Sequence, residues 1–282
     1  MYDTLIDTEL LAEHIGDPDW VICDCRFVLT MPEAGQTAYA ESHIPGAVYF
    51  HLDRDLAGPV TPASGRHPLP AADQLAALLG RAGINANTQI VAYDDMNGAI
   101  AARLWWLARW LGHHRIAVLD GGWQAWLAEH RLVNADIVEP GPQHFVSHCD
   151  DTRWVTSHEV LAVVSGHKPG RILDARAADR FRGENESLDP VAGHVPGAVN
   201  LPFTENVETG GRFHNLAELR IRFEAVLGDT PSEQVICMCG SGVTACHNLL
   251  AMELAGLKGA RLYAGSWSEW IRDTERPVIR GT

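Results

Sequence analysis

The fold is decided by the stretch Val235-Ile236-Cys237-Met238-Cys239-Gly240-Ser241-Gly242-Val243-Thr244-Ala245. Its first four residues are apolar and typical of a buried strand, and a glycine-rich turn and helical periodicity follow at once. In open α/β sheets, ligands bind at such turns, outside the carboxyl ends of the strands. Cys239 stands at this turn, where backbone N–H groups and a helix N-terminus can stabilise a thiolate. We therefore take Cys239 as the candidate nucleophile.

The turn itself suits an anionic sulfur. Gly240 and Gly242 allow the chain to curl so that successive N–H groups converge on the thiolate and form an anion nest. The loop residues Gly240, Gly242, Val243 and Thr244 are therefore candidates for binding the substrate. Thr244 is expected near the start of the following helix, where its hydroxyl can accept a hydrogen bond from a free N–H group.

The composition is that of a globular protein large enough for two domains. The chain has 282 residues, of which 46% are hydrophobic and 21% charged, and at this length single cores divide into domains. The formal net charge of −14 argues against a nucleic-acid partner. No apolar run has the length of a membrane span, and no export signal is visible. We therefore expect a cytoplasmic protein without membrane attachment.

The six cysteines are expected to be reduced thiols in that compartment. The pairs Cys23-x-Cys25 and Cys237-x-Cys239 match no zinc spacing, and alternate strand residues point to opposite faces of a sheet. We expect no metal site and no cofactor. Cys237 and Cys246 fit the usual fate of a free cysteine, which is to be a small buried hydrophobe.

The chain contains the same pattern twice, in the same order. The recurring blocks are 23–26 with 173–176, 43–48 with 194–199, 89–94 with 234–239, and 121–126 with 265–270. The Asp-x-Arg of the first block pair is expected to tie a strand end to a neighbouring loop rather than to act in catalysis. The tryptophans Trp105, Trp106, Trp123 and Trp267 are expected to be core aromatics on helices. Each copy is too long to be a solenoid repeat, so the chain is a tandem duplication of a domain.

Short β-branched runs alternate with helical periodicity in each copy. Strands are expected at 89–93, 116–119, 234–238 and 260–263, and helices at 73–82, 99–111, 216–227 and 244–254. This alternation predicts parallel strands with crossover helices. We predict an α/β protein with two tandem domains, 1–133 and 152–282, each a small parallel sheet flanked by helices. Residues 134–151 carry turn residues and little periodicity, and are predicted to be the linker.

Only the second copy can be a thiol enzyme. At the position of Cys239 the first copy carries Asp94, which offers no thiol. A carboxylate there is also expected to spoil an anion site. We therefore expect one active site per chain and a catalytically inactive first domain.

These motifs together resemble the tandem-domain rhodanese sulfurtransferases: the repeated His-x-Pro-Gly-Ala at His43 and His194, the aspartate in the first loop, and the Cys-Gly-Ser-Gly-Val-Thr loop at 239–244. The loop is similar to that of the 3-mercaptopyruvate sulfurtransferase branch, because vertebrate thiosulfate sulfurtransferases carry basic residues at the positions of Gly240 and Ser241. The resemblance implies that Cys239 takes sulfur from 3-mercaptopyruvate as a persulfide and releases pyruvate. A thiol such as thioredoxin or glutathione, or cyanide, then accepts the sulfur. We expect a monomer.

The resemblance also implies roles for side chains outside the loop. Ser241 is expected to work with His67 and Asp53 in proton transfer around the substrate thiol, with Asp55 as the alternative to Asp53.

Arginines are implied in binding the anionic donor. Arg180 matches the family arginine that binds it, and its guanidinium can donate two hydrogen bonds to a carboxylate. Nine residues on, where the family usually has a second arginine, this chain has Asp189. We expect Arg182 or Arg66 to substitute for it.

The sequence also bears on three other functions. The same scaffold working on thiosulfate remains open, although a dianion is held less well by a loop without basic residues. A cysteine phosphatase would need an arginine six residues after the cysteine, and that position is Ala245. A sulfur-binding module without catalysis also remains open.

Overall fold

The computed structural model describes residues 1–281 and contains two compact units, each with a five-stranded parallel sheet. Unit 1 comprises residues 1–58, 69–150 and 208–213. Unit 2 comprises residues 59–68 and 151–207 and the chain from residue 214 onward. The predicted α/β architecture with two parallel sheets is confirmed.

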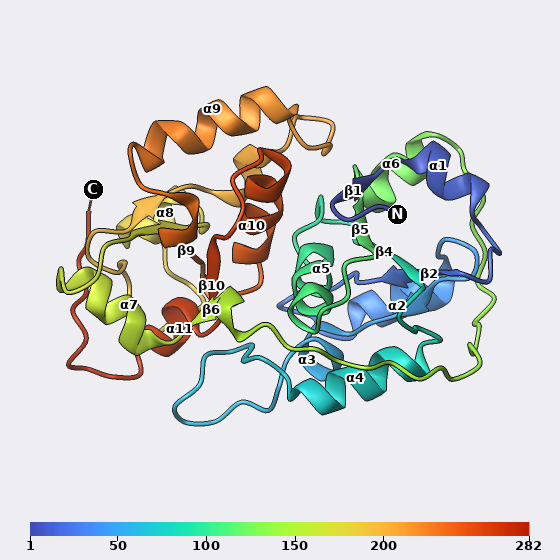
Figure 1. Cartoon of the computed structure of the whole chain (residues 1–282), viewed down its shortest axis with the longest axis horizontal. Coiled ribbons are helices and arrows are strands. Elements are labelled where there is room, and N and C mark those ends of the chain that lie inside the picture. Colours follow the sequence, from blue (N-terminus) through green and yellow to red (C-terminus); the bar gives the residue numbers. More distant parts are fainter. Residues whose placement is uncertain (282) are drawn as a thin grey trace. The chain divides into compact units, whose positions relative to one another are not determined.

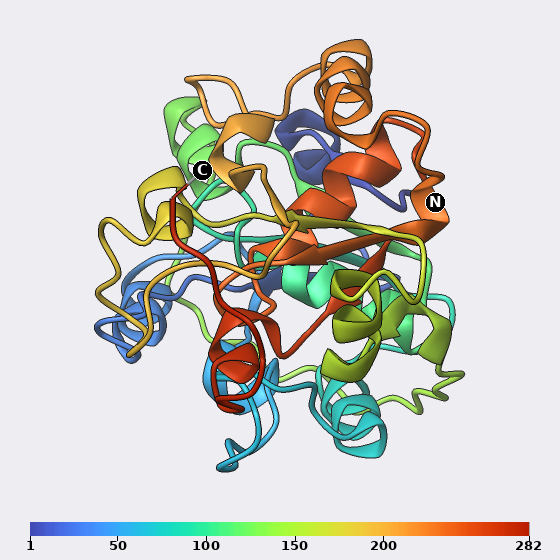
Figure 2. The same cartoon turned by 90° about the vertical axis from the view of Figure 1, so that its left-hand side faces the viewer.

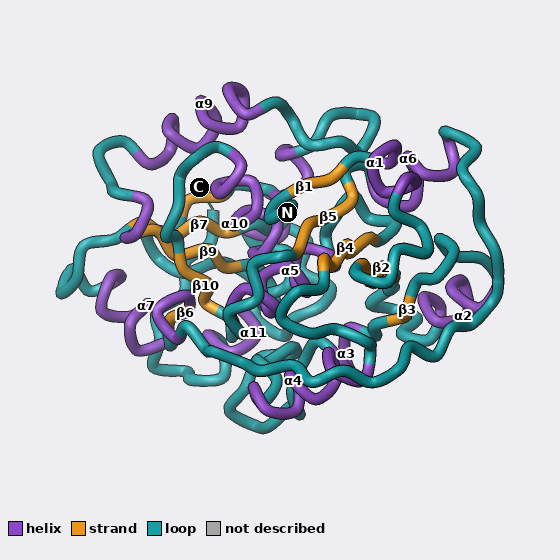
Figure 3. Tube along the Cα trace, turned by 45° about the vertical axis from the view of Figure 1, so that its right-hand side comes forward, coloured by secondary structure: helices purple, strands orange, loops and turns teal. Residues whose placement is uncertain are grey.

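Unit 1 has the strand order β1-β5-β4-β2-β3 (Figure 3). Its strands are β1 (Leu5–Ile6), β2 (Trp20–Asp24), β3 (Val48–Tyr49), β4 (Gln89–Tyr93) and β5 (Ile116–Leu119). Its helices are α1 (Thr8–Glu13), α2 (Ala34–Glu41), α3 (Leu52–Asp55), α4 (Ala72–Arg81), α5 (Ala101–Trp110) and α6 (Gly122–Ala128). Every residue of the central strand β4 is buried, as is typical of a parallel sheet covered on both faces.

Unit 2 repeats this topology with the strand order β6-β10-β9-β7-β8. Figure 1 labels β6, β9 and β10 of this sheet. Its strands are β6 (Trp154–Val155), β7 (Arg171–Asp174), β8 (Val199–Asn200), β9 (Val235–Met238) and β10 (Arg261–Tyr263). Its α-helices are α7 (Ser157–Val164), α8 (Ala178–Arg182), α9 (Leu216–Leu227), α10 (Ala245–Leu254) and α11 (Ser266–Trp270), and short 3₁₀ turns lie at η1 (Asp151–Arg153), η2 (Phe203–Asn206) and η3 (Ser232–Gln234). The central strand β9 therefore leads directly into the cysteine-bearing loop.

Helices cover both faces of the second sheet. Ile236 and Met238 pack into a core with Trp267 and Trp270 of α11, and α11 also contacts α7. Cys237 points to the other face, where its sulfur lies 3.9 Å from that of Met252 in α10. Helices α9 and α10 pack side by side (Figure 2). The period of two along β9 thus divides its side chains between two helical layers.

The expected helices form where the sequence supplies start and stop signals. Helix α9 begins after Asn215, whose side chain accepts from the N–H groups of Ala217 and Glu218 in a capping box, and it ends at Gly228 with a φ of 55°. The other expected helices and strands lie within two residues of their predicted bounds. No helix of the described chain is both long enough and apolar enough to cross a membrane.

The segment predicted as a linker lies against unit 1 along most of its length. Gln143 donates its N–H to the carbonyl of Gly80 at 2.8 Å, and His148 donates to Leu111 at 2.8 Å. Phe145 is buried. Residues up to Asp150 therefore belong to unit 1, and the predicted linker packs on that unit as an ordered segment.

The structural roles expected for the Asp-x-Arg blocks and the tryptophans are confirmed. Arg26 bonds both carboxylate oxygens of Asp24 and the carbonyl of Ser42. Arg176 bonds Asp174 and the carbonyl of Gly193 in the same way. The four tryptophans singled out in the sequence are buried on helices α5, α6 and α11.

Candidate active site

Cys239 directly follows β9 and is 2% exposed. The N–H group of Gly242 donates to its Sγ atom at 3.2 Å. Gly242 has a φ of +78°, and a Cβ atom there would overlap the carbonyl oxygen of Ala264. Only glycine can therefore bring this N–H group to the sulfur.

Ser266 holds the backbone of Cys239 from the neighbouring loop. Its Oγ atom accepts the Cys239 N–H at 3.0 Å and donates to the carbonyl of Tyr263 at 2.8 Å. Ser266 is fully buried with a φ of 52°, a left-handed conformation that is costly for a non-glycine residue. The sequence reasoning missed this residue. The repeat carried a signal for it, because the matching position in unit 1 is Gly122, with a φ of 54°.

The first turn of α11 fixes the carbonyl groups of the loop. Trp267 donates its N–H to the carbonyl of Cys239 at 3.0 Å, and Ser268 donates to that of Gly240 at 2.9 Å. These two carbonyl oxygens thus accept hydrogen bonds from α11 and not from the thiol.

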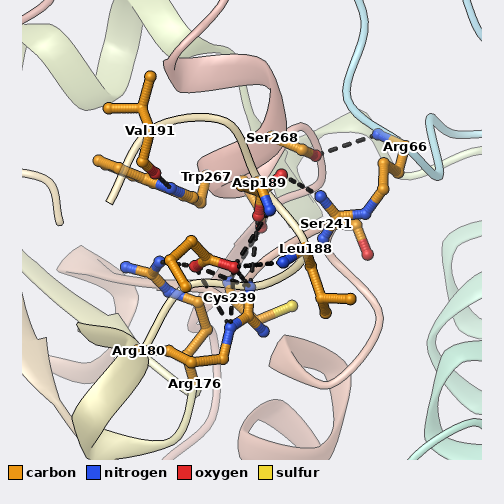
Figure 4. A network of polar contacts seen from close by, with 12 residues as sticks. Arg66, Arg176, Arg180, Leu188, Asp189, Val191, Cys239, Ser241, Trp267 and Ser268 are labelled. Atoms are coloured by element: carbon orange, nitrogen blue, oxygen red, sulfur yellow. Dashed lines mark hydrogen bonds and ion pairs between the residues drawn. The ribbon is translucent and has the colours of Figure 1, made fainter. Parts of the chain in front are cut away.

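Ser241 and His67 meet in unit 2. His67 Nδ1 lies 2.7 Å from Ser241 Oγ, and both side chains are buried. His67 comes from the segment 59–68, which is placed by close backbone contacts: Gly65 approaches Gly265 so closely that a Cβ atom would overlap its carbonyl, and the Arg66 N–H donates to Ser268 Oγ at 3.0 Å. Figure 4 shows this docking beside Ser241.

The two candidate aspartates lie in unit 1, on α3. Asp55 is half-buried, and its carboxylate accepts the N–H of His51 at 2.7 Å, which stabilises the start of the helix. Burial raises the pKa of Asp55. Asp53 is exposed. The carboxylate of Asp55 is thus engaged within its own helix.

Charged side chains surround the loop. Glu186 accepts two hydrogen bonds from Arg180 Nη2, at 2.8 and 3.0 Å, and Arg66 Nη1 makes an ion pair with Asp189. Asp189 also lies 3.3 Å from Arg180 Nη2. Behind them, Arg176 stacks over the ring of Trp267. Figure 4 shows the three arginines and Asp189 around Cys239.

Arg66 and Arg182 were expected as substitutes for the second arginine of the family. Of these two, only Arg66 lies close to the loop that carries Cys239. A Cβ atom built on Gly240 would lie 2.9 Å from Arg66 Nη2 and 3.7 Å from Arg180 Nη1. Arg182, by contrast, bonds Glu184 in a surface pair at 2.8 and 2.7 Å. Glycine at position 240 therefore leaves room for two guanidinium groups above the loop.

Of the remaining loop residues, Val243 and Thr244, the second does not make the hydrogen bond expected of it. Val243 is buried. Thr244 has helical backbone angles of −70° and −14°, and its side chain makes no capping bond. The prediction of a capping hydroxyl was wrong, because the helical turn already begins at Thr244 itself. The structural assignment of Cys237 and Cys246 as buried thiols is confirmed, and burial raises the pKa of Cys237.

The matching loop of unit 1 is a filled anion cradle. The buried carboxylate of Asp94 accepts four backbone N–H groups at 2.7 to 2.8 Å. The donors are Met96, Gly98, Ile100 and Ala101. The carboxylate does not abolish the anion site, as the sequence suggested, but occupies it.

The family model described as Rhodanese-like domain matches residues 7–129 and 156–273. The chain belongs to the rhodanese-like family. A "Probable 3-mercaptopyruvate sulfurtransferase" of Pseudomonas aeruginosa is 45% identical over 280 residues, 98% of each chain. A thiosulfate sulfurtransferase of Rattus norvegicus is 32% identical over 283 residues, 96% of this chain and 93% of the relative.

Solved structures give the same assignment for this rhodanese-like chain. The crystal structure of SseA from Escherichia coli, described among 3-mercaptopyruvate sulfotransferases, matches with a TM-score of 0.82 and 32% identity. The match covers 95% of this chain and 100% of that one. The predicted relationship to the tandem rhodanese sulfurtransferases is therefore confirmed.

Proposed function

We propose that the protein is a sulfurtransferase that moves sulfur from 3-mercaptopyruvate through a persulfide on Cys239 to a thiol acceptor. The observation that carries this proposal is the thiol of Cys239 at the end of β9, with the Gly242 N–H at 3.2 Å from its sulfur. A thiolate held in this way is a nucleophile toward a second sulfur atom. The names of the relatives support the same chemistry.

The first half-reaction exchanges one covalent bond for another. The Cys239 thiolate attacks the sulfur of 3-mercaptopyruvate and forms an S–S bond, while the bond between that sulfur and the donor methylene breaks. The electron pair of the broken bond goes to the methylene carbon, giving the enolate of pyruvate. The proton of the donor thiol moves to that carbon, so that pyruvate leaves and the persulfide anion remains.

Ser241 and His67 are proposed to carry this proton. Their atoms Oγ and Nδ1 are 2.7 Å apart, which is a hydrogen bond suited to a relay. Asp53 is proposed to orient His67, as the third member of the set. Unit 1, whose loop holds Asp94, is proposed to be catalytically inactive.

In the second half-reaction an acceptor thiolate attacks the outer sulfur of the persulfide and forms a new S–S bond, while the bond between that sulfur and Cys239 Sγ breaks. The electron pair of the broken bond returns to Cys239, which leaves as the thiolate. Thioredoxin, glutathione or another thiol fits this step, and cyanide can replace it. We propose that the chain works as a monomer in the cytoplasm.

Thiosulfate is the second candidate donor. One observation favours it: Arg66 brings a guanidinium to Gly240, where the neutral loop itself offers no cation. Asp189 opposes this effect, because it is paired with Arg66. We therefore place 3-mercaptopyruvate first.

Mass spectrometry after mixing the protein with each donor tests the proposal. We expect Cys239 to gain one sulfur atom from 3-mercaptopyruvate and to lose it on addition of cyanide or a dithiol. The Cys239→Ser variant should gain none, and the Cys149→Ser variant, which changes an exposed cysteine, should behave as the parent. Labelling of Cys237 or Cys246 instead would refute the assignment. A kcat/KM that is larger for thiosulfate would reverse the order of donors.

A further inference from the structure

Two guanidinium groups converge above Gly240 with unused hydrogen-bond donors. Arg66 Nη2 and Arg180 Nη1 lie 2.9 and 3.7 Å from the point where a Cβ atom of Gly240 would stand. Within the described chain, neither nitrogen donates a hydrogen bond, and the buried Arg66 Nε also has no acceptor. Guanidinium donors directed at one point are typical of a carboxylate site.

Asp189 forms ion pairs with both of these arginines. One of its carboxylate oxygens pairs with Arg66 Nη1, and the other lies 3.3 Å from Arg180 Nη2. Its side chain is only 3% exposed. The backbone of Asp189 is fixed as well, because its N–H donates to Glu186 at 3.1 Å. Asp189 therefore sets the separation of the two guanidinium groups and holds Arg66 on the loop (Figure 4).

The carboxylates also limit the positive charge at this point. Glu186 pairs with Arg180, Asp189 pairs with Arg66, and Asp174 pairs with Arg176, which lies deeper. Each guanidinium of the site is thus matched by one buried carboxylate. Such a site offers directed donors without a large positive field, and it suits a single negative charge better than a double one.

We propose that Asp189, which bridges Arg66 and Arg180 at the expected site for the donor carboxylate, is the residue that selects a monoanionic α-keto acid over a dianion. This inference rests on the proposed sulfurtransferase function. Arg66 contacts the substrate, and Asp189 acts as a positioning residue through Arg66 and through its charge.

The Asp189→Asn variant removes the charge and keeps the contact to Arg66, because its amide oxygen can still accept from Arg66 Nη1 while its NH2 group gives up only the longer contact to Arg180. Removing one negative charge a few ångströms from the donor should raise the ratio of kcat/KM for thiosulfate to that for 3-mercaptopyruvate by about tenfold. The Arg66→Ala variant should raise KM for 3-mercaptopyruvate about tenfold with a smaller change in kcat, since the clamp binds ground state and transition state alike. Arg66→Lys keeps the charge and should recover part of this loss.

The coupling between the two residues is a further readout. Asp189→Ala should affect the KM for 3-mercaptopyruvate strongly in the parent and little in the Arg66→Ala background. The exposed pair Arg220 and Glu224 on α9 serves as the matched control. Arg220→Ala should change neither KM nor the donor ratio, and thermal unfolding of each variant reports on folding.

Three outcomes overturn these claims, one for the proposed function and two for the inference. If the parent protein gains no sulfur on Cys239 from 3-mercaptopyruvate, the proposed function fails. If the parent gains sulfur but Asp189→Asn leaves the donor ratio unchanged within about twofold, the inference alone fails. It fails equally if Arg66→Ala raises KM no more than Arg220→Ala does.

Discussion

Replacing Asp94 by alanine should destabilise unit 1 by about 4 kcal/mol, because the backbone N–H groups of Met96, Gly98, Ile100 and Ala101 lose their acceptor together and those of the last three are buried. A hydrogen bond to a charged group contributes roughly 1.5–3 kcal/mol, so four such bonds would exceed 6 kcal/mol if they were simply additive. The carboxylate is fully buried, however, and this burial raises its pKa while the four donors oppose the rise. The desolvation cost brings the expected net effect down to the range measured when one partner of a buried charged pair is removed, about 3–5 kcal/mol.

Equilibrium unfolding in urea, followed by tryptophan fluorescence, measures this effect, because Trp105, Trp106 and Trp126 all lie in unit 1. The neighbouring Asp95 provides the control. It lies in the same loop, but its Oδ1 atom accepts no hydrogen bond from the described residues. Asp95→Ala should change the free energy of unfolding by less than about 0.5 kcal/mol. Equal effects of the two substitutions, or an Asp94→Ala effect below about 1 kcal/mol, would show that the cradle does not stabilise the unit.

Three further predictions concern the loop and one buried histidine. Ser266→Ala should slow sulfur loading of Cys239 about tenfold, since the Cys239 N–H loses its acceptor. Ser266→Gly should slow loading equally but cost less stability, because it relieves the positive φ, and rapid-quench mass spectrometry with thermal unfolding separates the two effects. Gly242→Ala should abolish loading, since its Cβ would overlap a carbonyl oxygen, and a variant that loads normally would contradict the packing described. Burial lowers the pKa of His113 below its usual 6.5, so the unfolded chain binds more protons just below pH 6.5. The stability it contributes is present above about pH 6.5 and falls as the pH drops toward the folded pKa. His113→Gln should flatten this fall in urea titrations, and an unchanged slope would exclude His113 as its source.

Local sequence signals predicted the elements that carry the site. The strand Val235–Met238 is a continuous apolar run, and the capping residues of α9 and the glycine after it fix the ends of that helix. The thiol at the strand end could be predicted for the same reason, because its position depends on neighbours in the chain. The capping role given to Thr244 failed because the beginning of a helix within a tight turn depends on the turn geometry rather than on residue type.

The contacts made across the fold were harder to predict. Residues 59–68 show no periodicity, and no local signal in them predicts that the Arg66 N–H donates to Ser268 Oγ. From the sequence, Asp189 showed only that an arginine was missing. Its partner in the structure is Arg66, and a contact between residues more than a hundred positions apart has no local signal. Ser266 was hidden for a similar reason, since its role depends on the Cys239 N–H in another loop.

The carboxylate of Asp94 has one more consequence. An aspartate side chain ends two bonds beyond Cβ, at the same bond count as the outer sulfur of a cysteine persulfide. Gly98, which donates to Asp94, and Gly242, which donates to Cys239, both have positive φ values, of 88° and 78°. Unit 1 therefore holds, as a permanent part of its covalent structure, a terminal negative charge of the kind that unit 2 would acquire only when sulfur is delivered to it.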